Sequence, residues 1–434
     1  MKDVTLKDGA APTRVTLANG LQVVAVHQPH VSRALVALYV RVGSRFEDEA
    51  KNGLSHFLEH MIYRGTPSLK KAHDVNLAFE SIGGYLYAAT QVDYAVFSVA
   101  VPLESLERAV SLFADVLVNP TFSDIEIEKG IVCEEILEDL DDDGRQIDAD
   151  NLSRKLVYPT HPLGFTITGS EKTVKSFTPA MLRAHHAKHF TTGSAALVFS
   201  GNVDTKTATA LAEKHFTAFP RGDRVEAIAP PATQKKPRLS IVENSSSQTE
   251  LRLSFRAIAD AAPDKPAMDM LMRLVDDGMS SRLYHRICDS KGLCYDVTAG
   301  FDGYEDDGIV DFAAGVQHAR ADRVTSEILE LMKELATDGP TDEELVIARR
   351  RHAWDIAAMK DSAEDMAGFY GHGVIFGRSP SLEKTATRLD DVTAEDVRRL
   401  TAKLCEPDRL NVVAVGLLEA DVERRLKAAV TGWK

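Results

Sequence analysis

The chain has 434 residues, of which 44% are hydrophobic and 27% are charged, and its net charge is −14. This composition is typical of a folded protein, and the length suggests about three domains at roughly 150 residues each. The acidic balance argues against a nucleic-acid partner, which needs a basic face, and against binding to anionic lipid. No run approaches the roughly 18 apolar residues needed to span a bilayer, so we also expect no membrane partner.

The cysteine pattern and the first residues bear on the compartment. The four cysteines include no pair at CxxC spacing, which argues against a disulfide framework. The first dozen residues contain no apolar stretch of the signal-peptide kind. We therefore expect a cytoplasmic protein, or a periplasmic one if a signal peptide was removed.

The first half of the chain mixes strands and helices. Alternating and apolar runs predict strands at 15–17, 21–27, 34–42 and 95–101, with a turn at Asn19 and Gly20. Apolar stripes of helical period predict helices at 53–62, 73–81, 103–117 and 124–140. Strands in clusters joined by hairpin turns indicate an α+β protein with largely antiparallel sheets flanked by helices. We expect the run Asp141–Asp143 to lie at the solvated end of the last of these helices.

Two segments of the sequence repeat at nearly one offset. Thr178 and Thr393 each open a helix as the N-cap, and each is followed 23 residues later by a glycine that ends an apolar strand. These two copies are 215 residues apart, and the segments before two acidic helices, at Thr121 and Gly339, are 218 apart. The sequence therefore predicts two homologous halves, 13–220 and 237–434, joined by a linker at 221–236 that contains two adjacent prolines.

The segment His56-Phe57-Leu58-Glu59-His60 is the strongest chemical signal. Residues at i and i+4 share a helix face, so both imidazoles can reach one ion, and Glu59 borders that face. Neutral imidazoles suit Zn²⁺, and a carboxylate beside the metal can accept a proton from bound water. This His-x-x-Glu-His order occurs in metallopeptidases. The alternative is a pair of partly exposed helix histidines beside a surface glutamate.

A catalytic zinc site needs a third protein ligand, and the helix predicted at 124–140 offers candidates. Glu128 and Glu135 are seven residues apart and share nearly one face, whereas Glu134 points about 100° away from Glu135. The pair suits one metal ligand and one carboxylate that orients a ligating histidine. The alternative is an acidic helix face in contact with solvent.

These segments together resemble the pitrilysin/insulinase family of zinc peptidases. The resemblance rests on GLSHFLEHMIYRGT at 53–66, EKGIVCEEI at 128–136, HPLG at 161–164 with the later Gly169, GMSSRL at 278–283 and GLCY at 292–295. It spans nearly the whole chain, and it looks closest to the roughly 50 kDa branch that includes the mitochondrial processing peptidase β-subunit.

The resemblance implies a fold, an activity and a set of roles. The fold would be half of a clamshell built from two α+β halves, of which only the first binds metal. One Zn²⁺ per chain would be held by His56, His60 and Glu135, with Glu59 as the general base and Glu128 as a supporting carboxylate. The activity would be a metalloendopeptidase that cleaves extended or unfolded peptides in a closed chamber.

The sequence departs from the family where substrate is bound. The family has an arginine and a tyrosine seven residues apart in its second half, and here Tyr295 matches the tyrosine but Cys288 stands at the arginine position. Arg286, two residues away on a helix, would point about 200° away. In the edge strand that pairs with substrate, Tyr87 stands in place of the family's asparagine and is followed by Ala88, whose backbone can still bind a peptide.

These departures leave three hypotheses about partners. In the first, the chain is the zinc-bearing subunit of a heterodimer, and a homologous partner supplies the arginine and tyrosine. In the second, Arg282 or Arg286 substitutes locally, and the chain is an active monomer or homodimer. In the third, the chain is a non-catalytic scaffolding subunit of the same fold, which the complete set of metal-binding groups argues against.

Overall fold

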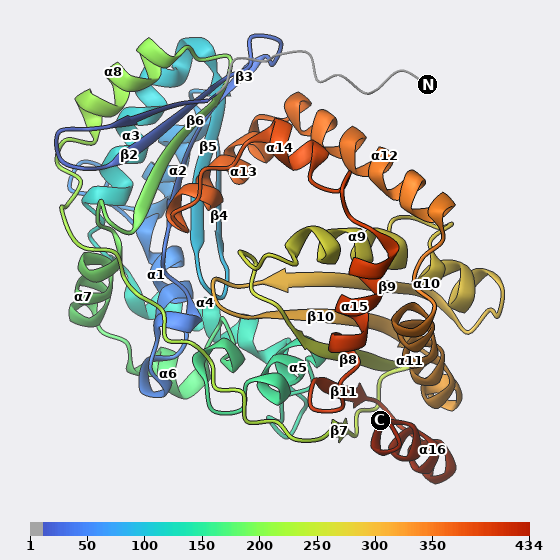
Figure 1. Cartoon of the computed structure of the whole chain (residues 1–434). Helices are drawn as coiled ribbons and strands as arrows, with labels where there is room; N and C mark the ends of the chain where they lie inside the picture. The colour runs from blue at the N-terminus through green and yellow to red at the C-terminus, as the bar shows by residue number, and fades with distance from the viewer. Residues whose placement is uncertain (1–11) are drawn as a thin grey trace. The chain divides into compact units, whose positions relative to one another are not determined.

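The computed structural model describes residues 12–434, and these residues form two compact units. The segment 1–11, which shows no signal-peptide pattern, lies outside the described residues. Unit 1 contains residues up to 138 together with 165–227 and 355–383, and unit 2 contains 139–164, 228–354 and 384–434. Each unit is a sheet flanked by helices (Figure 1). Among the described residues, no helix is both long enough and apolar enough to cross a membrane.

Unit 1 is built on a six-stranded sheet of order β1-β2-β6-β3-β5-β4, in which only β2 and β6 pair in parallel. Its strands are β1 (Thr13–Thr16), β2 (Gln22–His27), β3 (Arg33–Val40), β4 (Tyr85–Thr90), β5 (Ala95–Pro102) and β6 (Ala195–Gly201). Its helices are α1 (Leu54–Ile62), α2 (Ala72–Glu80), α3 (Leu106–Val118), α4 (Ile125–Leu137), α6 (Glu171–Ser176), α7 (Pro179–His189), α8 (Thr205–His215) and α13 (Ala363–Ile375).

Unit 2 is built on a five-stranded sheet of order β7-β11-β8-β10-β9, in which only β7 and β11 pair in parallel. Its strands are β7 (Arg238–Val242), β8 (Thr249–Ala257), β9 (Cys294–Gly303), β10 (Gly308–Val316) and β11 (Leu410–Val415). Its helices are α5 (Ala149–Val157), α9 (Lys265–Val275), α10 (Arg282–Tyr284), α11 (Ala321–Thr337), α15 (Ala394–Leu404) and α16 (Ala420–Thr431). The borders of the unit along the chain fall within α12 (Asp342–Ala358) and α14 (Leu382–Thr387).

The predicted repeat is confirmed by the topology. Without β1, the strand order β2-β6-β3-β5-β4 corresponds position by position to β7-β11-β8-β10-β9. The strands β6 and β11 begin at 195 and 410, and the helices before them begin at 179 and 394, which gives an offset of 215 in both cases. Thr178 and Thr393 are the N-caps of those helices, as predicted, and each side-chain oxygen accepts a hydrogen bond from the backbone three residues later.

Each of the predicted halves, 13–220 and 237–434, contributes one helix to the unit that is built mainly from the other half. Helix α5 packs on β8 and β11 of unit 2, and α13 packs on β3 and β6 of unit 1. These helices begin 214 residues apart, at 149 and 363, so they are counterparts in the repeat. Each half of the chain therefore supplies a helix that covers the sheet of the other half. An apolar stripe predicts that such a helix is buried, but it carries no information about which sheet buries it.

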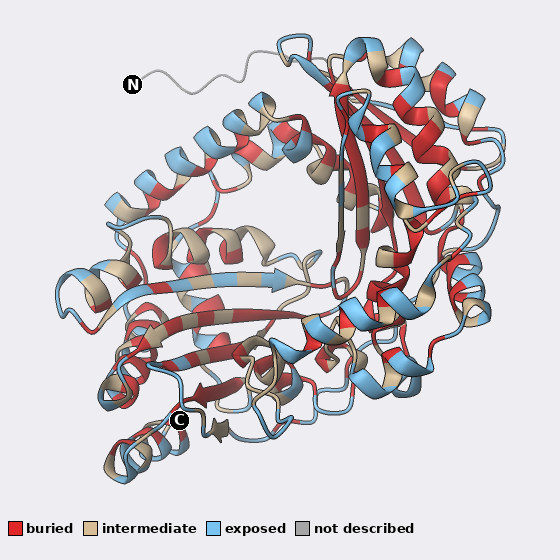
Figure 2. Cartoon of the chain, turned by 180° about the vertical axis from the view of Figure 1, so that it is seen from behind, coloured by how far each residue is buried: buried red, intermediate tan, exposed pale blue. Residues whose placement is uncertain are grey.

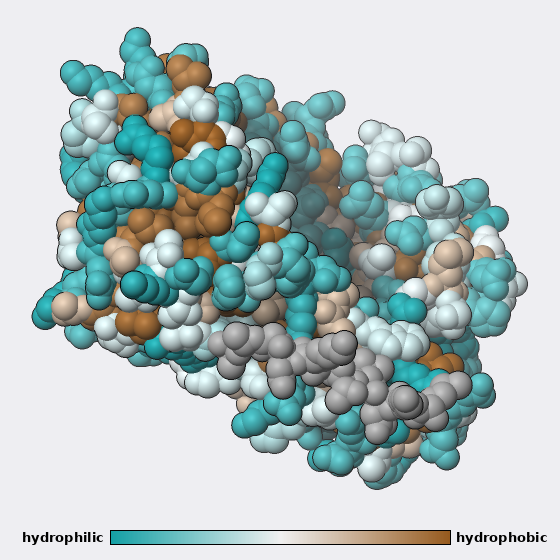
Figure 3. All heavy atoms as spheres, turned by 90° about the horizontal axis from the view of Figure 1, so that it is seen from above, coloured by the Kyte–Doolittle hydropathy of each residue, from teal (hydrophilic) through white to brown (hydrophobic). Residues whose placement is uncertain are grey.

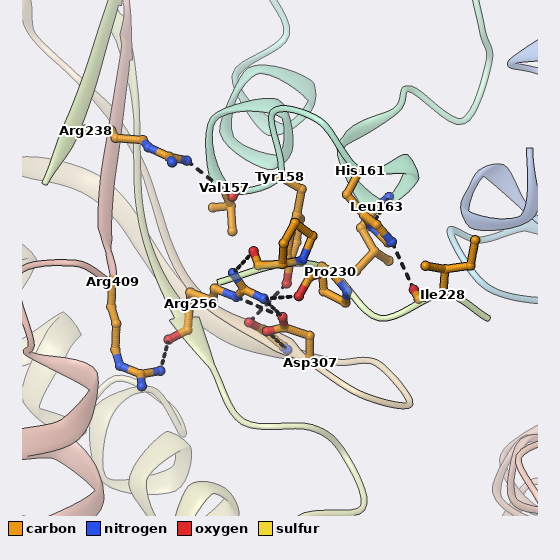
Figure 4. Close-up of polar contacts among 12 residues, drawn as sticks. Val157, Tyr158, His161, Leu163, Ile228, Pro230, Arg238, Arg256, Asp307 and Arg409 are labelled. Carbon is orange, nitrogen blue, oxygen red and sulfur yellow. Dashed lines mark hydrogen bonds and ion pairs between the residues drawn. The ribbon is translucent and has the colours of Figure 1, made fainter. Parts of the chain in front are cut away.

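The exchanged segment 139–164 and the end of the linker are fixed to unit 2 by polar contacts (Figure 4). His161 Nε2 donates to the carbonyl of Ile228 at 3.0 Å, and its Nδ1 accepts from Leu163 N at 3.2 Å. Arg256 donates to the carbonyls of Pro230 and Pro231 at 2.9 and 2.7 Å, forms an ion pair with Asp307, and lies over the ring of Tyr158. This arrangement gives the HPLG segment a structural role.

Burial follows the sheets in both units. The central strands β2, β3, β5, β6, β8, β10 and β11 are largely buried and the outer strands are more exposed, and the helices alternate buried and exposed residues around their axes (Figure 2). Hydrophilic residues cover much of the face seen in Figure 3, where a hydrophobic patch is visible on unit 1. The boundaries of the predicted elements differ from the structure by up to three residues, and at one of them the charge run is involved: α4 ends at Leu137, and Asp141–Asp143 lies in a turn after it. Asp141 Oδ1 accepts from Asp143 N and Arg145 N at 3.0 and 2.8 Å, so the charge run forms a local side-chain turn and does not continue the helix.

Candidate metal centre

The helix that carries the His-x-x-Glu-His segment is fixed at its N-terminus by a buried carboxylate. Glu47, which is 8% exposed, accepts hydrogen bonds from Gly53 N at 2.8 Å and from Ser55 N at 2.6 Å. The first backbone N–H groups of a helix have no partner within the helix and carry partial positive charge, so a carboxylate there satisfies and stabilises them. Burial raises the pKa of Glu47, and the hydrogen bonds from Ser55, Asn52 and Gly53 oppose that shift.

Three predicted ligands come together in unit 1. His56 and His60 lie one turn apart on α1, with ring centroids 4.6 Å apart, and Glu135 on α4 faces both. His56 Nε2 is 3.4 Å from Glu135 Oε1, and His60 Nε2 is 3.7 Å from Glu135 Oε2. The hydrogen bond from His56, opposed by burial, and the charges of both imidazoles hold the pKa of Glu135 below its usual range.

This donor set fits a zinc ion. One ligand atom from each of the three residues lies within 4.8 Å of the other two, and within the described residues no other group of His, Cys, Asp and Glu meets that condition. Ligands at about 2.0–2.1 Å from a tetrahedral ion are roughly 3.4 Å apart, which matches the closest His56–Glu135 distance. Two imidazoles and one carboxylate also leave a fourth position for water, as in catalytic sites.

Glu128 supports one of the histidines. Its Oε1 accepts a hydrogen bond from His60 Nδ1 at 2.8 Å, and its Oε2 forms an ion pair with Arg64 Nε at 3.0 Å. Burial lowers the pKa of His60, but the hydrogen bond to Glu128 and the nearby carboxylates raise it more, so the net shift is upward. The structure thus brings Glu128 to His60 Nδ1 and leaves His60 Nε2 facing Glu135.

Glu59 lies beside the three ligands and is fixed from the sheet. Thr90 Oγ1, at the end of β4, donates to Glu59 Oε2 at 2.8 Å. The other carboxylate oxygen is not engaged by Thr90 and can accept a proton from a group near the histidines. The hydrogen bond also joins α1 to β4, the edge strand of the sheet.

Sequence reasoning missed several residues that organise this site. Ser55 Oγ shares a hydrogen bond with His185 Nε2 at 2.9 Å, and burial lowers the pKa of His185 well below its usual value. His189, on the same helix, donates to the carbonyl of Arg41 at 2.7 Å. These histidines have structural partners, and His185 contacts the metal-site helix. Glu47 and Thr90 carried no motif signal, because their partners are set by the path of the chain and not by helical spacing. Arg64 lies within the segment 53–66 that carries the family resemblance, but the sequence assigned it no role.

The predicted substrate-contact residues belong to both units. Tyr87 and Ala88 lie on β4, the edge strand of unit 1. Tyr295 lies at the start of β9 in unit 2 and is 92% exposed. Cys288 lies in a short π-helix, His285–Asp289, with its Sγ 3.7 Å from Cys294 Sγ.

The two arginines near Cys288 are both engaged in ion pairs within unit 2. Arg282 forms a two-point ion pair with Glu344, at 2.6 and 2.8 Å. Arg286 contacts Glu327 and Glu334, each at 2.7 Å. Their charges are therefore neutralised by neighbouring carboxylates, which argues against local substitution for the missing arginine.

The chain matches two family models that follow each other along the sequence. The model described as insulinase (peptidase family M16) matches residues 22–169, and the model described as the peptidase M16 inactive domain matches residues 176–351. The first match contains the candidate metal centre. The second covers most of the half in which the sequence shows no His-x-x-Glu-His segment.

Curated relatives are similar over nearly their full length. A protein of Mycobacterium tuberculosis named an uncharacterized zinc protease is 32% identical over 408 residues, which cover 91% of each chain. The zinc protease YmxG of Bacillus subtilis, also named uncharacterized, is 29% identical over 91% of this chain and 96% of its own.

Solved structures share the fold. A protease from Helicobacter pylori superposes with a TM-score of 0.86 at 23% identity and covers 94% of this chain and 99% of its own. A peptidase M16 inactive domain from Pseudomonas fluorescens has the same TM-score and identity, over 95% and 99% of the two chains. From the two family-model matches and the similarity to the mycobacterial protein, we conclude that this chain belongs to the insulinase family of peptidases, M16.

Proposed function

We propose that the chain is a zinc-dependent endopeptidase whose single Zn²⁺ is held by His56, His60 and Glu135. The observation that carries this proposal is the convergence of these three side chains within 4.8 Å on two helices of unit 1. A bound zinc ion would polarise the peptide carbonyl and lower the pKa of a water molecule toward neutrality. Glu59, held by Thr90, accepts the proton of that water and passes it to the leaving amine. Glu128 keeps His60 in the tautomer whose Nε2 is available as a ligand.

The substrate in this proposal is an extended peptide that adds to the free edge of β4. An edge strand presents unpaired N–H and C=O groups, so backbone hydrogen bonds from residues such as Ala88 can bind a peptide of any sequence. The hydrogen bond between Thr90 and Glu59 connects this edge to the proton acceptor. Because a folded protein offers few such strands, we expect unfolded or extended peptides to be cleaved, within a closed chamber as the family resemblance implies.

We also propose that a homologous partner completes the catalytic apparatus. The support is the thiol of Cys288 at the arginine position, together with the ion pairs that hold Arg282 and Arg286. A thiol cannot make the forked, charge-assisted hydrogen bonds of a guanidinium. The isolated chain should thus bind zinc but turn over peptides slowly, and Cys288→Arg or a homologous chain with the arginine–tyrosine pair should raise turnover about 10²–10³-fold. High turnover by the isolated chain that is unchanged in Cys288→Arg but lost in Arg286→Ala would contradict the proposal that a partner chain is needed.

The peptidase proposal is tested with the full chain, a quenched unfolded peptide and metal analysis. We expect one zinc per chain, cleavage that stops when a chelator removes the metal, and recovery when zinc is added back. Stoichiometric zinc without cleavage, with or without a homologous chain, would favour the scaffolding hypothesis. Cleavage that persists in the metal-free protein would contradict the proposal.

A further inference from the structure

Two tyrosines of β4 lie on the face of the sheet opposite to the metal-site helix. In the pairing of β4 with β5, Tyr85 and Tyr87 are opposite Ala100 and Ser98, whereas Leu86 and Ala88 are opposite Val99 and Phe97. Phe97 packs against Tyr63 and Phe190 in the core beneath α1 and α7. Since side chains alternate along a strand, Tyr85 and Tyr87 point to the other face.

This second face is covered only in part. Helix α13 packs over β3 and β6, and a Cβ on its Gly371 would come within 2.2 Å of the ring of Tyr39, so helix and ring are in close contact. Tyr39 is accordingly 7% exposed, but Tyr85 is 71% exposed and Tyr87 is 50% exposed. Their partners across the strand, Ala100 and Ser98, are too small to cover the rings. Two neighbouring aromatic side chains therefore stand in solvent along a free strand edge.

The same strand leads to the metal centre. Thr90, three residues after Tyr87, lies on the opposite face from the tyrosines and donates to Glu59. A peptide that adds to the edge of β4 has the same alternation, so every second side chain lies beside the tyrosines. The remaining side chains lie on the face of Leu86, Ala88 and Thr90.

We propose that Tyr85 and Tyr87 form an aromatic pair that selects the substrate, favouring peptides with aromatic or β-branched residues at two positions, i and i+2. This inference rests on the proposed function, because it assumes that the substrate adds to β4. Cross-strand aromatic and aromatic–β-branched neighbours stabilise sheets, and each such pair should tighten binding by about 3- to 5-fold. The pair sets side-chain preference, whereas the backbone groups of β4 set the extended form of the bound peptide.

The test measures binding and not turnover, so it does not depend on catalysis. The full chain with the Glu59→Gln substitution is loaded with zinc and titrated with fluorescent peptides. All peptides have the same length and consist of Ala and Ser, except for two Phe residues. One series has the two Phe residues at i and i+2, and the other has them at i and i+1. Each peptide is measured against the protein with native tyrosines, Tyr85→Ala/Tyr87→Ala, Tyr85→Phe/Tyr87→Phe, and Leu103→Ala as an exposed apolar control.

We expect the i, i+2 peptides to bind about 3- to 5-fold tighter than the i, i+1 peptides when both tyrosines are present, because an i, i+1 peptide can place only one Phe residue beside the tyrosines. This ratio should fall toward one in the double Ala variant and persist in the double Phe variant and in Leu103→Ala. An equal affinity for both series, or a ratio that survives in the double Ala variant, would overturn the inference. The peptidase proposal would fail on a different result, the absence of cleavage by the wild-type chain. The binding ratios do not depend on cleavage, so the two failures can be distinguished.

Discussion

Glu128 and His60 are joined by a 2.8 Å hydrogen bond between Oε1 and Nδ1, in a part of unit 1 where Glu128 is only 5% exposed. This contact fixes the imidazole with its Nε2 toward Glu135. The ion pair from Arg64 holds Glu128 from the other side. A carboxylate in this arrangement orients a ligand and increases its basicity without binding the metal itself.

Glu128→Gln should therefore weaken zinc binding about 10–100-fold without abolishing it, since losses of such supporting groups have this size. Competition with a chromophoric chelator measures the affinity. Glu135→Gln provides the comparison, because loss of a ligand should reduce zinc occupancy much further. Complete loss in Glu128→Gln together with an unaffected Glu135→Gln would mean that the two carboxylates have the opposite roles.

Glu47→Gln should destabilise the protein by about 1–3 kcal/mol, because a buried amide places a donor against backbone N–H groups that need an acceptor. The N-terminus of α1 would lose its charge-assisted hydrogen bonds from Gly53 and Ser55. Chemical unfolding of the zinc-free protein measures the change. Asp48→Asn, at a neighbouring carboxylate whose side chain is 60% exposed, is the matched control. Equal changes in the free energy of unfolding for the two substitutions would show that the buried hydrogen bonds of Glu47 do not contribute more to stability than an exposed carboxylate.

The ion pair of Arg282 and Glu344 should make stability depend on pH in the acid range. The hydrogen bond from Arg282 lowers the pKa of Glu344 from 4.5 to about 2. A carboxylate with a depressed folded-state pKa contributes stability that is complete above about 4.5 and is lost as the pH falls toward 2. The difference in unfolding midpoint between the zinc-free wild type and Glu344→Gln should accordingly shrink between pH 5 and pH 3. If the difference in unfolding midpoint stays constant between pH 5 and pH 3, the stability lost in Glu344→Gln comes from packing and not from the ion pair.

Separate fragments made at the linker, 12–220 and 237–434, should not fold on their own. The first lacks α13, which covers β3 and β6, and the second lacks α5, which covers β8 and β11. Each would expose an apolar sheet face that is buried in the full chain. Mixing the fragments should restore cooperative unfolding, as followed by circular dichroism. If either fragment alone unfolds cooperatively at the midpoint of the full chain, the exchanged helices are not required for folding and this prediction is wrong.

Much of the site could be predicted because its signals are local. His56 and His60 are one helical turn apart, and Glu128 and Glu135 two turns apart, so each pair shares a face whatever the rest of the fold. The repeat was likewise visible in the sequence as a nearly constant offset between matching segments. The contacts of Thr90 and His185 could not be predicted, because each joins elements far apart in the sequence. Glu47 is close to α1 in the sequence, but no motif indicates that the loop between them returns its carboxylate to the start of the helix. The exchange of α5 and α13 could not be predicted either. The two helices are homologous and the two sheets are homologous, so the sequence of a helix does not show which sheet it covers.

The central claim is that Glu59 accepts the proton in a zinc-dependent cleavage of peptides. Peptide turnover per bound zinc, compared between the wild type and Glu59→Gln at equal zinc occupancy and with the same partner chain present, tests this claim most directly. Removal of a general base typically costs 10²–10⁴-fold, so we expect a loss of that size with zinc content unchanged. Turnover by Glu59→Gln close to the wild-type value, still dependent on zinc, would contradict the account.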